Sequence, residues 1–361
     1  MVERICEYFD NIGSSGKKIT LGLDGFVDEV WQVLENRSSR TDYKVFDKMR
    51  DFAKSVYDTG EGGYANEIIR KRRSYGGFVA NTGKAVGRLG ANPTLLGMFG
   101  SPLDPVFAEF NAAYPLISIA SPSICQIFEF RDGKLMLPYV EESMDFSWDS
   151  LQSAMPRKDL ENAFDADIVA IGYWSQLQHF DNIITELCNK LLIPGRCKRM
   201  FYDFADIRKR DKEALIHTLS LLADLDMPMS LSLNEHEAAL LFSYYNNHFD
   251  WEQPKGAEQE AEEVRKKTDL DELIIHTPTF ALAATSTEGT ATVPQHHCQN
   301  PIITTGAGDN FNGGYLTASL ASGHLTLSER LHVGNATTSF YIKNGHSPNI
   351  TELKSELYLR D

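Results

Sequence analysis

Cysteine, positive charge and long apolar runs are all scarce in this chain. Its cysteines are odd in number and widely spaced (Cys6, Cys125, Cys188, Cys197, Cys298), which argues against a disulfide framework or a zinc site. Acidic residues outnumber basic ones by 50 to 35, and the net charge of -15 disfavours binding to nucleic acid. No stretch reaches the roughly 18 apolar residues of a membrane span, and the first ten residues lack the order of a secretory signal. These absences predict a cytoplasmic protein without nucleic-acid or membrane partners.

What remains is the composition of a globular protein, with 42% apolar and 24% charged residues in 361. A chain of this length favours one large domain with a modest appendage. Short apolar runs alternate with segments of helical periodicity, which predicts an α/β fold with a mainly parallel sheet covered by helices on both faces. The expected strands are 18–23, 94–97, 168–172, 199–202, 229–233, 273–276, 280–285 and 290–293, the last three forming an antiparallel edge.

A second, smaller sheet is expected apart from the main one. Residues 125–130 and 134–138 alternate in polarity around an Asp132-Gly133 turn, which is a strong hairpin signal. We expect 25–36 and 117–140 to build this small sheet. The polar stretch 37–74 between its parts has apolar residues near helical spacing and is predicted to be a helical insertion, with Arg70–Arg73 on a solvated helix face.

The strongest chemical signal is the glycine-rich segment TTGAGDNFNGG at 304–314. Amides at the start of a helix attract anions, so Gly306, Ala307 and Gly308 are candidates to bind a phosphoryl group. Asp309 follows at once and could accept a proton from a hydroxyl. Phe311 stands where a dinucleotide fingerprint needs glycine, and no Gly-Lys-Ser or Gly-Lys-Thr follows, so neither common nucleotide loop fits. An ordinary helix capped by Asp309 is the alternative.

Two signatures in this order resemble the PfkB, or ribokinase-like, carbohydrate kinases. One is the segment 304–314, and the other is GGFVAN at 76–81 with Leu-Gly at 89–90. The resemblance implies a single ribokinase-like domain over 1–361, a three-layer sandwich whose small β sheet acts as a lid. It also implies a sugar kinase that transfers the γ-phosphoryl group of ATP, with Mg²⁺ as cofactor and Asp309 as general base.

The resemblance also assigns further residues to the site. It implies sugar contacts from Asp24, Gly76, Gly77 and Asn81, with Asp28 as an additional candidate. Nucleotide contacts are implied for Asn234, Glu237, Thr277 and Asn335, and Asn234 and Glu237 would also hold magnesium through water. Helix capping would explain Asn234 equally well, and a strand-end turn would explain Asp24.

The chain departs from the family pattern at Ile303, where relatives usually carry an aspartate tied to a monovalent-cation site, so potassium is not expected. Lids of this family can join subunits, which implies a possible homodimer through the lid. Three alternatives stay open: a nucleoside kinase, a sugar kinase that uses ADP, and a sugar-binding regulator without turnover. The insertion at 37–74 and the segment 126–130 favour the ADP version, whereas the retained Asp309 argues against the regulator. The identity of the sugar stays open.

Overall fold

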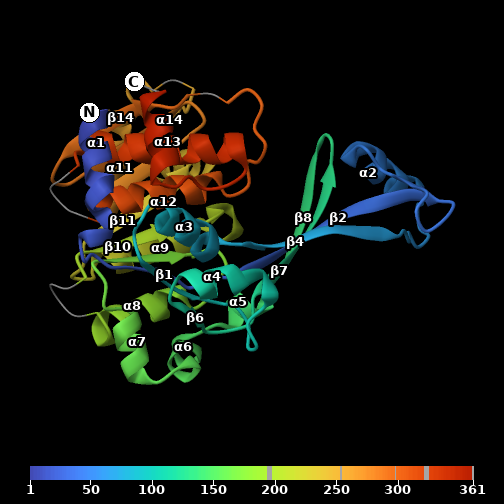
Figure 1. Cartoon of the computed structure of the whole chain (residues 1–361), viewed down its shortest axis with the longest axis horizontal. Helices are drawn as coiled ribbons and strands as arrows, with labels where there is room; N and C mark the ends of the chain where they lie inside the picture. Colours follow the sequence, from blue (N-terminus) through green and yellow to red (C-terminus); the bar gives the residue numbers. More distant parts are fainter. Residues whose placement is uncertain (193–196, 253, 297, 321–324, 360–361) are drawn as a thin grey trace.

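The larger part of the molecule is built on a nine-stranded sheet (Figure 1). The computed structural model describes residues 1–192, 197–252, 254–296, 298–320 and 325–359. Neighbouring strands pair in parallel, except that β12–β13 and β13–β14 pair antiparallel at one edge. In spatial order the strands are β14 (Gly289–Pro294), β13 (Phe280–Thr285), β12 (Glu272–His276), β11 (Met229–Asn234), β10 (Arg199–Asp203), β9 (Ile168–Gly172), β1 (Ile19–Gly22), β5 (Pro93–Gly97) and β6 (Leu116–Ser118).

Two hydrophobic cores lie on the two faces of this sheet. Successive side chains of a strand point to opposite faces, so Ile168 and Ala170 of β9 enter one core while Val169 and Ile171 enter the other. Because both faces are covered, the central strands β1, β9 and β11 are almost wholly buried, as is usual for parallel sheets. The prediction of a mainly parallel α/β fold is therefore confirmed.

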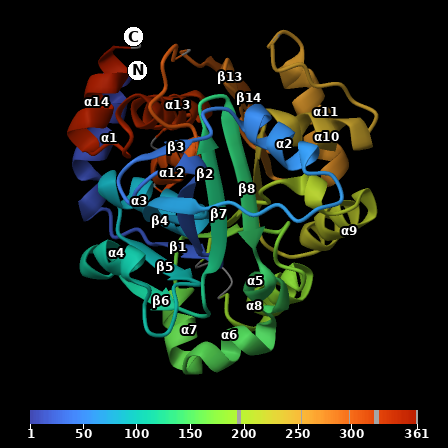
Figure 2. The same cartoon turned by 90° about the vertical axis from the view of Figure 1, so that its right-hand side faces the viewer.

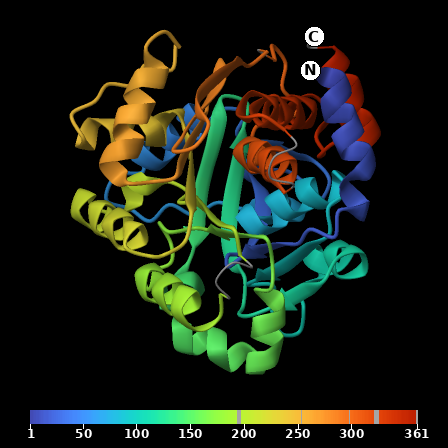
Figure 3. The same cartoon turned by 90° about the vertical axis from the view of Figure 1, so that its left-hand side faces the viewer.

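Helices from different parts of the chain cover each face. The first and last helices pack on the same side, which brings the two termini together (Figure 3). In the part of the chain that the structure describes, the α-helices of that core are α1 (Val2–Asn11), α3 (Phe78–Arg88), α4 (Ala108–Ala113), α12 (Ala307–Ser319), α13 (Leu327–Asn344) and α14 (Ile350–Tyr358). The other face is covered by α6 (Trp148–Ala154), α7 (Arg157–Ala163), α8 (Phe180–Lys190), α9 (Lys212–Ala223), α10 (Glu235–Tyr244) and α11 (Ala257–Thr268). Short 3-10 helices occupy Ile12–Ser14, Pro105–Phe107 and Ile207–Lys209.

A second sheet stands off the main body, as expected from the hairpin signal (Figures 1 and 2). β7 (Ser123–Phe130) and β8 (Gly133–Tyr139) form the predicted hairpin. β2 (Phe26–Arg37) pairs in parallel with β7 and antiparallel with β4 (Ile68–Gly76) and β3 (Tyr43–Val45). The short α5 (Glu141–Asp145) follows the hairpin. We call these five strands the small sheet.

The segment 37–74 is only partly helical, which corrects the expectation of a helical insertion. It contains one helix, α2 (Met49–Asp58), but also β3 and most of β4. The basic cluster Arg70–Arg73 lies on β4, where residues 68–75 are all exposed or half-buried, so no apolar run marks this segment as a strand. At the tip of the small sheet, Phe52 of α2 stacks on Phe130 of β7 with ring centroids 5.7 Å apart. The insertion therefore braces the β7–β8 hairpin.

Among the residues that the structure describes, no helix is both long and apolar enough to cross a membrane.

Candidate active site

Three neighbouring cavities meet where the parallel strands end, the usual place for ligands in such sheets. The large cavity, about 680 Å³, lies beneath the small sheet and borders β2, α3, β8 and the loop 301–305. The second cavity, about 420 Å³, lies between the starts of α10 and α12, the β12–β13 turn and α13. A small cavity of about 190 Å³ lies at the start of α12. Thr304 borders all three, so ligands in the large and second cavities would meet beside this loop.

The loop before α12 exposes two backbone amides at that meeting point. Gly306 caps the helix with φ at 83°, a left-handed conformation that glycine adopts without strain. The amide of Ala307 donates to the carbonyl of Thr304 at 3.1 Å. Within the described chain, the amides of Gly306 and Gly308 have no hydrogen-bond acceptor. Of the three amides predicted to bind a phosphoryl group, these two are free to do so.

Asp309 lies in the first turn of α12 and lines the small cavity. Its side chain is 9% exposed, and its Oδ2 accepts a hydrogen bond from Asn81 Nδ2 at 2.8 Å. Burial, and secondarily the nearby charge of Asp203, hold the pKa of Asp309 well above its ordinary value. A carboxyl group with a raised pKa is suited to accept a proton from a hydroxyl near neutral pH.

The carboxylate of Asp24 points at the start of α3 rather than into any of the three cavities. Its two oxygens accept from the amides of Phe78 at 2.8 Å and Val79 at 2.9 Å. Gly77, with φ at 91°, must lack a side chain here, because a Cβ would stand 2.1 Å from Asp24 Oδ2. Burial raises the pKa of Asp24 to about 7. Asp24 and Gly77 thus shape this junction, and a direct sugar contact from either stays a prediction.

Asp28 and Asn81 do line the large cavity. Asp28 lies on β2 opposite Ser74 of β4, and the next-but-one residue, Gly76, ends β4 beside it. Burial raises the pKa of Asp28 to about 6. Asn81 links this cavity to the small one through its hydrogen bond with Asp309. These two polar side chains, of which Asp28 was the lesser candidate from sequence, are placed to meet a ligand with hydroxyl groups.

Asn234 and Glu237 begin α10 as a capping box. Asn234 Oδ1 accepts from the amides of His236 at 2.9 Å and Glu237 at 3.0 Å, while Glu237 Oε2 accepts from the amide of Asn234 at 3.0 Å. The capping alternative for Asn234 is therefore what the structure shows, although both residues also line the small cavity. Burial, followed by the charge of Asp203, raises the pKa of Glu237 to about 9.

Asp203 is the functional candidate that sequence reasoning missed. It ends β10 and lines the small cavity together with Glu237 and Asp309, and we call these three residues the acidic cluster. Asp203 accepts from the amide of Ala205 at 2.8 Å and from Asn312 Nδ2 at 2.9 Å, and burial raises its pKa to about 6. The available signal was an aspartate directly after a buried strand, at the same sheet edge as the other candidates.

The acidic cluster fits a divalent cation that is held largely through water and phosphate. The charge of Asp203 adds to burial in raising the pKa values of Glu237 and Asp309, so a nearby positive charge would favour their ionised forms. Carboxylate and carbonyl oxygens are the ligands that magnesium prefers, usually with several waters retained. Across the described residues, no three acidic, histidine or cysteine side chains could hold a metal by themselves. A magnesium ion here would therefore need oxygens from a bound substrate as well.

The second cavity contains the remaining predicted residues. Thr277 is buried in the β12–β13 turn and donates from Oγ1 to the carbonyl of Phe280 at 2.9 Å. Asn335 of α13 is 1% exposed and donates to the carbonyl of Pro294 at 3.2 Å. His276 stacks near Phe311, and burial lowers its pKa to about 4, so the ring is neutral. Most of the exposed surface of this pocket is apolar, which suits a nucleotide base.

Comparisons with known proteins agree with this geometry. The family model described as "Prokaryotic ketohexokinase" matches residues 6–358. A protein named ketohexokinase from Haloferax volcanii is 27% identical over 353 residues, which cover 94% of this chain and 90% of that protein.

Two solved structures share the fold. The nucleoside kinase of Methanocaldococcus jannaschii, described as an archaeal member of the ribokinase family, has a TM-score of 0.62 and 18% identity, covering 95% of this chain and 98% of its own. A putative ribokinase II from Escherichia coli, in complex with ATP and magnesium, has a TM-score of 0.63 and 15% identity over 96% and 99% of the two chains. The chain thus belongs to the prokaryotic ketohexokinase family, has the ribokinase-like fold and is a sugar kinase.

Proposed function

We propose that the protein transfers the γ-phosphoryl group of ATP to a hydroxyl of a neutral ketohexose, with Asp309 as general base. The observation that carries this proposal is the position of Asp309 in the small cavity, beside two free amides and bound to Asn81 of the large cavity. The ketohexose is inferred from the relative named ketohexokinase. ATP as donor is inferred from the related fold in complex with ATP and magnesium.

The charges of the large cavity support an uncharged acceptor. Three cations line it, and each already faces a carboxylate: Arg72 and Lys134 share Glu129 at 3.1 and 3.9 Å, and Lys84 pairs with Glu109 at 2.7 Å. A sugar phosphate would have to compete with these partners for a cation. A neutral sugar instead needs hydroxyl partners, which Asp28 and Asn81 supply.

In the proposed reaction, the nucleotide occupies the second cavity and the sugar the large one. As the sugar oxygen bonds to the γ-phosphorus, the bond from that phosphorus to the β-phosphate bridging oxygen breaks and ADP leaves. The hydroxyl proton passes to the carboxylate of Asp309, and the amides of Gly306 and Gly308 stabilise charge on the transferred group. Magnesium, when bound, would neutralise phosphate charge. Glu237, Asp203 and Asn234 would hold it, mainly through water.

We further propose that the small sheet acts as a lid over the large cavity. Lys134 of β8 already reaches the loop before α12, with its Nζ 3.3 Å from Thr305 Oγ1. Closure would exclude water from the phosphoryl group and limit hydrolysis of ATP. Met136, Leu137 and Tyr139 of β8 are about half exposed, at 46%, 51% and 54%. A second copy of the chain could cover them, which makes a homodimer through the lid part of the proposal.

A substrate panel tests the proposal. Ketohexoses, aldohexoses, pentoses, nucleosides and fructose phosphates should be assayed with ATP or ADP and magnesium, in the presence and absence of potassium. We expect phosphorylation of a ketohexose by ATP, without a potassium requirement because of Ile303. Turnover of nucleosides alone, or with ADP alone as donor, would reject the assignment. Sugar binding without any product would favour the regulator.

A further inference from the structure

Helix α13 sends two hydroxyl groups to the loop that begins α12. Tyr341 Oη donates to the carbonyl of Thr305 at 2.8 Å. Thr338, three residues earlier and on the same face of the helix, donates from Oγ1 to the carbonyl of Ala307 at 2.5 Å. Both contacts cross between separate elements, so neither arises from local helix geometry.

The two bonded carbonyls belong to the same peptide groups as the two free amides. The carbonyl of Thr305 shares a planar peptide with the amide of Gly306, and that of Ala307 shares one with the amide of Gly308. The intervening peptide differs: its carbonyl, on Gly306, accepts from the backbone and side chain of Asn310, and its amide, on Ala307, is already bound to Thr304. The hydroxyl groups of α13 therefore act on the two peptides that still have an amide to offer.

A hydrogen bond to a carbonyl draws electron density through the peptide and makes its N–H a stronger donor. Such cooperative strengthening amounts to about 10–30% per bond, and a hydrogen bond is stronger where water is excluded. The same contact fixes the plane of the peptide, and with it the direction of the amide. Both effects matter most when negative charge grows on a group in front of the amides.

We propose that Tyr341 and Thr338 are positioning residues that aim and polarise the amides of Gly306 and Gly308 toward the phosphoryl group in the transition state. This inference rests on the proposed function. The pKa of Tyr341 is raised by burial and by the nearby Asp309, which keeps the hydroxyl protonated and able to donate. The glycine-rich motif supplies the two amides, and the side chains of Tyr341 and Thr338 orient them.

Direct contact with substrate is the competing explanation, and the positions of the two residues separate it. Tyr341 lines the large cavity, whereas Thr338 lines the second cavity. A contact role would therefore change the KM for sugar in one variant and the KM for nucleotide in the other. Activation of the amides predicts instead that both variants lose kcat, because both peptides serve the same phosphoryl group.

The test uses Tyr341→Phe, Thr338→Val and their combination in the full-length protein. Removing a whole donor from such a site lowers kcat by roughly 10²–10³-fold, so weakening one that remains should have a smaller effect. We expect kcat to fall about 3–10-fold for each single variant and more for the double variant, with each KM within about twofold of wild type. Affinity for ADP, magnesium and aluminium fluoride, a mimic of the phosphoryl group in transfer, should fall in parallel, while affinity for ADP and magnesium alone stays constant.

Control variants remove hydroxyl groups that also donate to backbone carbonyls but lie away from this loop. Tyr8→Phe removes a hydroxyl that donates to the carbonyl of Thr317, farther along α12, at 2.7 Å. Thr185→Val removes one that donates to the carbonyl of Asp181 in α8 at 2.8 Å. Both should keep the wild-type kcat, and Thr338→Ser, which retains a hydroxyl, should restore most of it.

Two results would overturn the inference: an unchanged kcat in the double variant, or losses confined to one KM in each single variant. The melting temperature of each variant shows whether it is folded, and either single variant suffices if the other is not. If the wild-type protein phosphorylates no sugar with ATP, the proposed function fails first, and this inference fails with it. That result is distinct from an active wild type whose variants lose nothing.

Discussion

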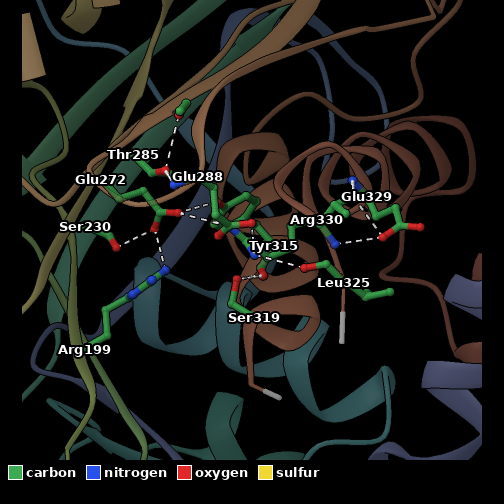
Figure 4. A network of polar contacts seen from close by, with 12 residues as sticks. Arg199, Ser230, Glu272, Thr285, Glu288, Tyr315, Ser319, Leu325, Glu329 and Arg330 are labelled. Atoms are coloured by element: carbon green, nitrogen blue, oxygen red, sulfur yellow. Dashed lines mark hydrogen bonds and ion pairs between the residues drawn. The ribbon is translucent and has the colours of Figure 1, made fainter. Parts of the chain in front are cut away.

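Helix α12 passes between two groups of buried ionisable side chains that differ in how their charge is balanced. The first group surrounds Glu272 of β12, which is 1% exposed. Its carboxylate lies within 2.7 Å of polar atoms of Arg199, Ser230 and Tyr315, and Tyr315 belongs to α12 (Figure 4). Arg330 of α13 lies 3.8 Å from the same carboxylate and also binds Glu288. We call this group the paired network. Each buried charge here has a partner of opposite sign.

The acidic cluster at the start of the same helix is arranged the other way. Asp203, Glu237 and Asp309 lie around one small cavity, and no lysine or arginine of the described chain forms an ion pair with them. Burial raises the pKa values of all three, and the charge of Asp203 raises those of Glu237 and Asp309 further. A folded protein keeps such groups unpaired where a cation or a proton arrives during function. We therefore infer that the paired network stabilises the fold and that the acidic cluster serves catalysis.

Asp309→Asn should have the largest effect on turnover. The substitution removes the proton acceptor but keeps a similar shape, so kcat should fall about 10²–10⁴-fold. Steady-state kinetics with the best sugar of the panel measures the loss, and nucleotide binding should remain close to that of wild type. A variant that turns over nearly as fast as wild type would remove Asp309 from its proposed role.

Glu272→Ala should break the paired network and lower stability rather than catalysis. It leaves Arg199 and Arg330 without their shared carboxylate, and breaking a buried pair in this way costs about 3–5 kcal/mol. Thermal unfolding should show a clearly lower melting temperature, while kcat at low temperature stays close to wild type.

Asp203→Asn provides the contrast within the acidic cluster. It relieves repulsion from Asp309 and Glu237, so its melting temperature should not fall in the same way. If both variants lose stability equally, the distinction between the paired network and the acidic cluster is wrong.

Glu237→Gln should weaken the use of magnesium by a smaller factor. Groups that hold a metal through water typically contribute about 10–100-fold to its affinity, so the magnesium concentration for half-maximal rate should rise by that much. Glu288→Gln, in the paired network, is the matched control and should leave magnesium dependence alone. An unchanged requirement in Glu237→Gln would refute the assignment.

The sequence predicted the main sheet well because its strands are buried on both faces and stand out as apolar runs. β4 was missed, since residues 68–75 are all exposed or half-buried and its charged residues read as a helix surface. The expected small-sheet segment 117–140 begins too early, because β6 (Leu116–Ser118) pairs in parallel with β5 at the edge of the main sheet. A strand is recognised from sequence as an apolar run only where both of its faces are buried.

The candidate site was predictable where a single segment holds several functional groups, as at Gly306–Asp309. It was not predictable where groups from distant segments converge. The orientation of Asp203 depends on Asn312 of α12, which in turn accepts from Ser232 of β11 at 2.7 Å. The side chain of Asp24 points away from the cavities because its carboxylate accepts hydrogen bonds from the amides that begin α3. Such relations arise from packing between elements, which spacing along one sequence does not encode.

The smallest expected effect is a pH dependence of stability caused by the titration of Asp203 in the acidic cluster. The folded-state pKa of Asp203, about 6, lies above its ordinary value of 3.8, so folding favours the protonated form. Its contribution is complete below about pH 3.8 and is lost as the pH rises through about 6. Asn cannot ionise, so the melting temperature of Asp203→Asn relative to wild type should rise by a few degrees between pH 4 and pH 7. Magnesium with ADP should reduce this difference, because it stabilises the ionised aspartate of the wild type. A difference that stays constant with pH would show that the pKa of Asp203 is the same in the folded and unfolded states.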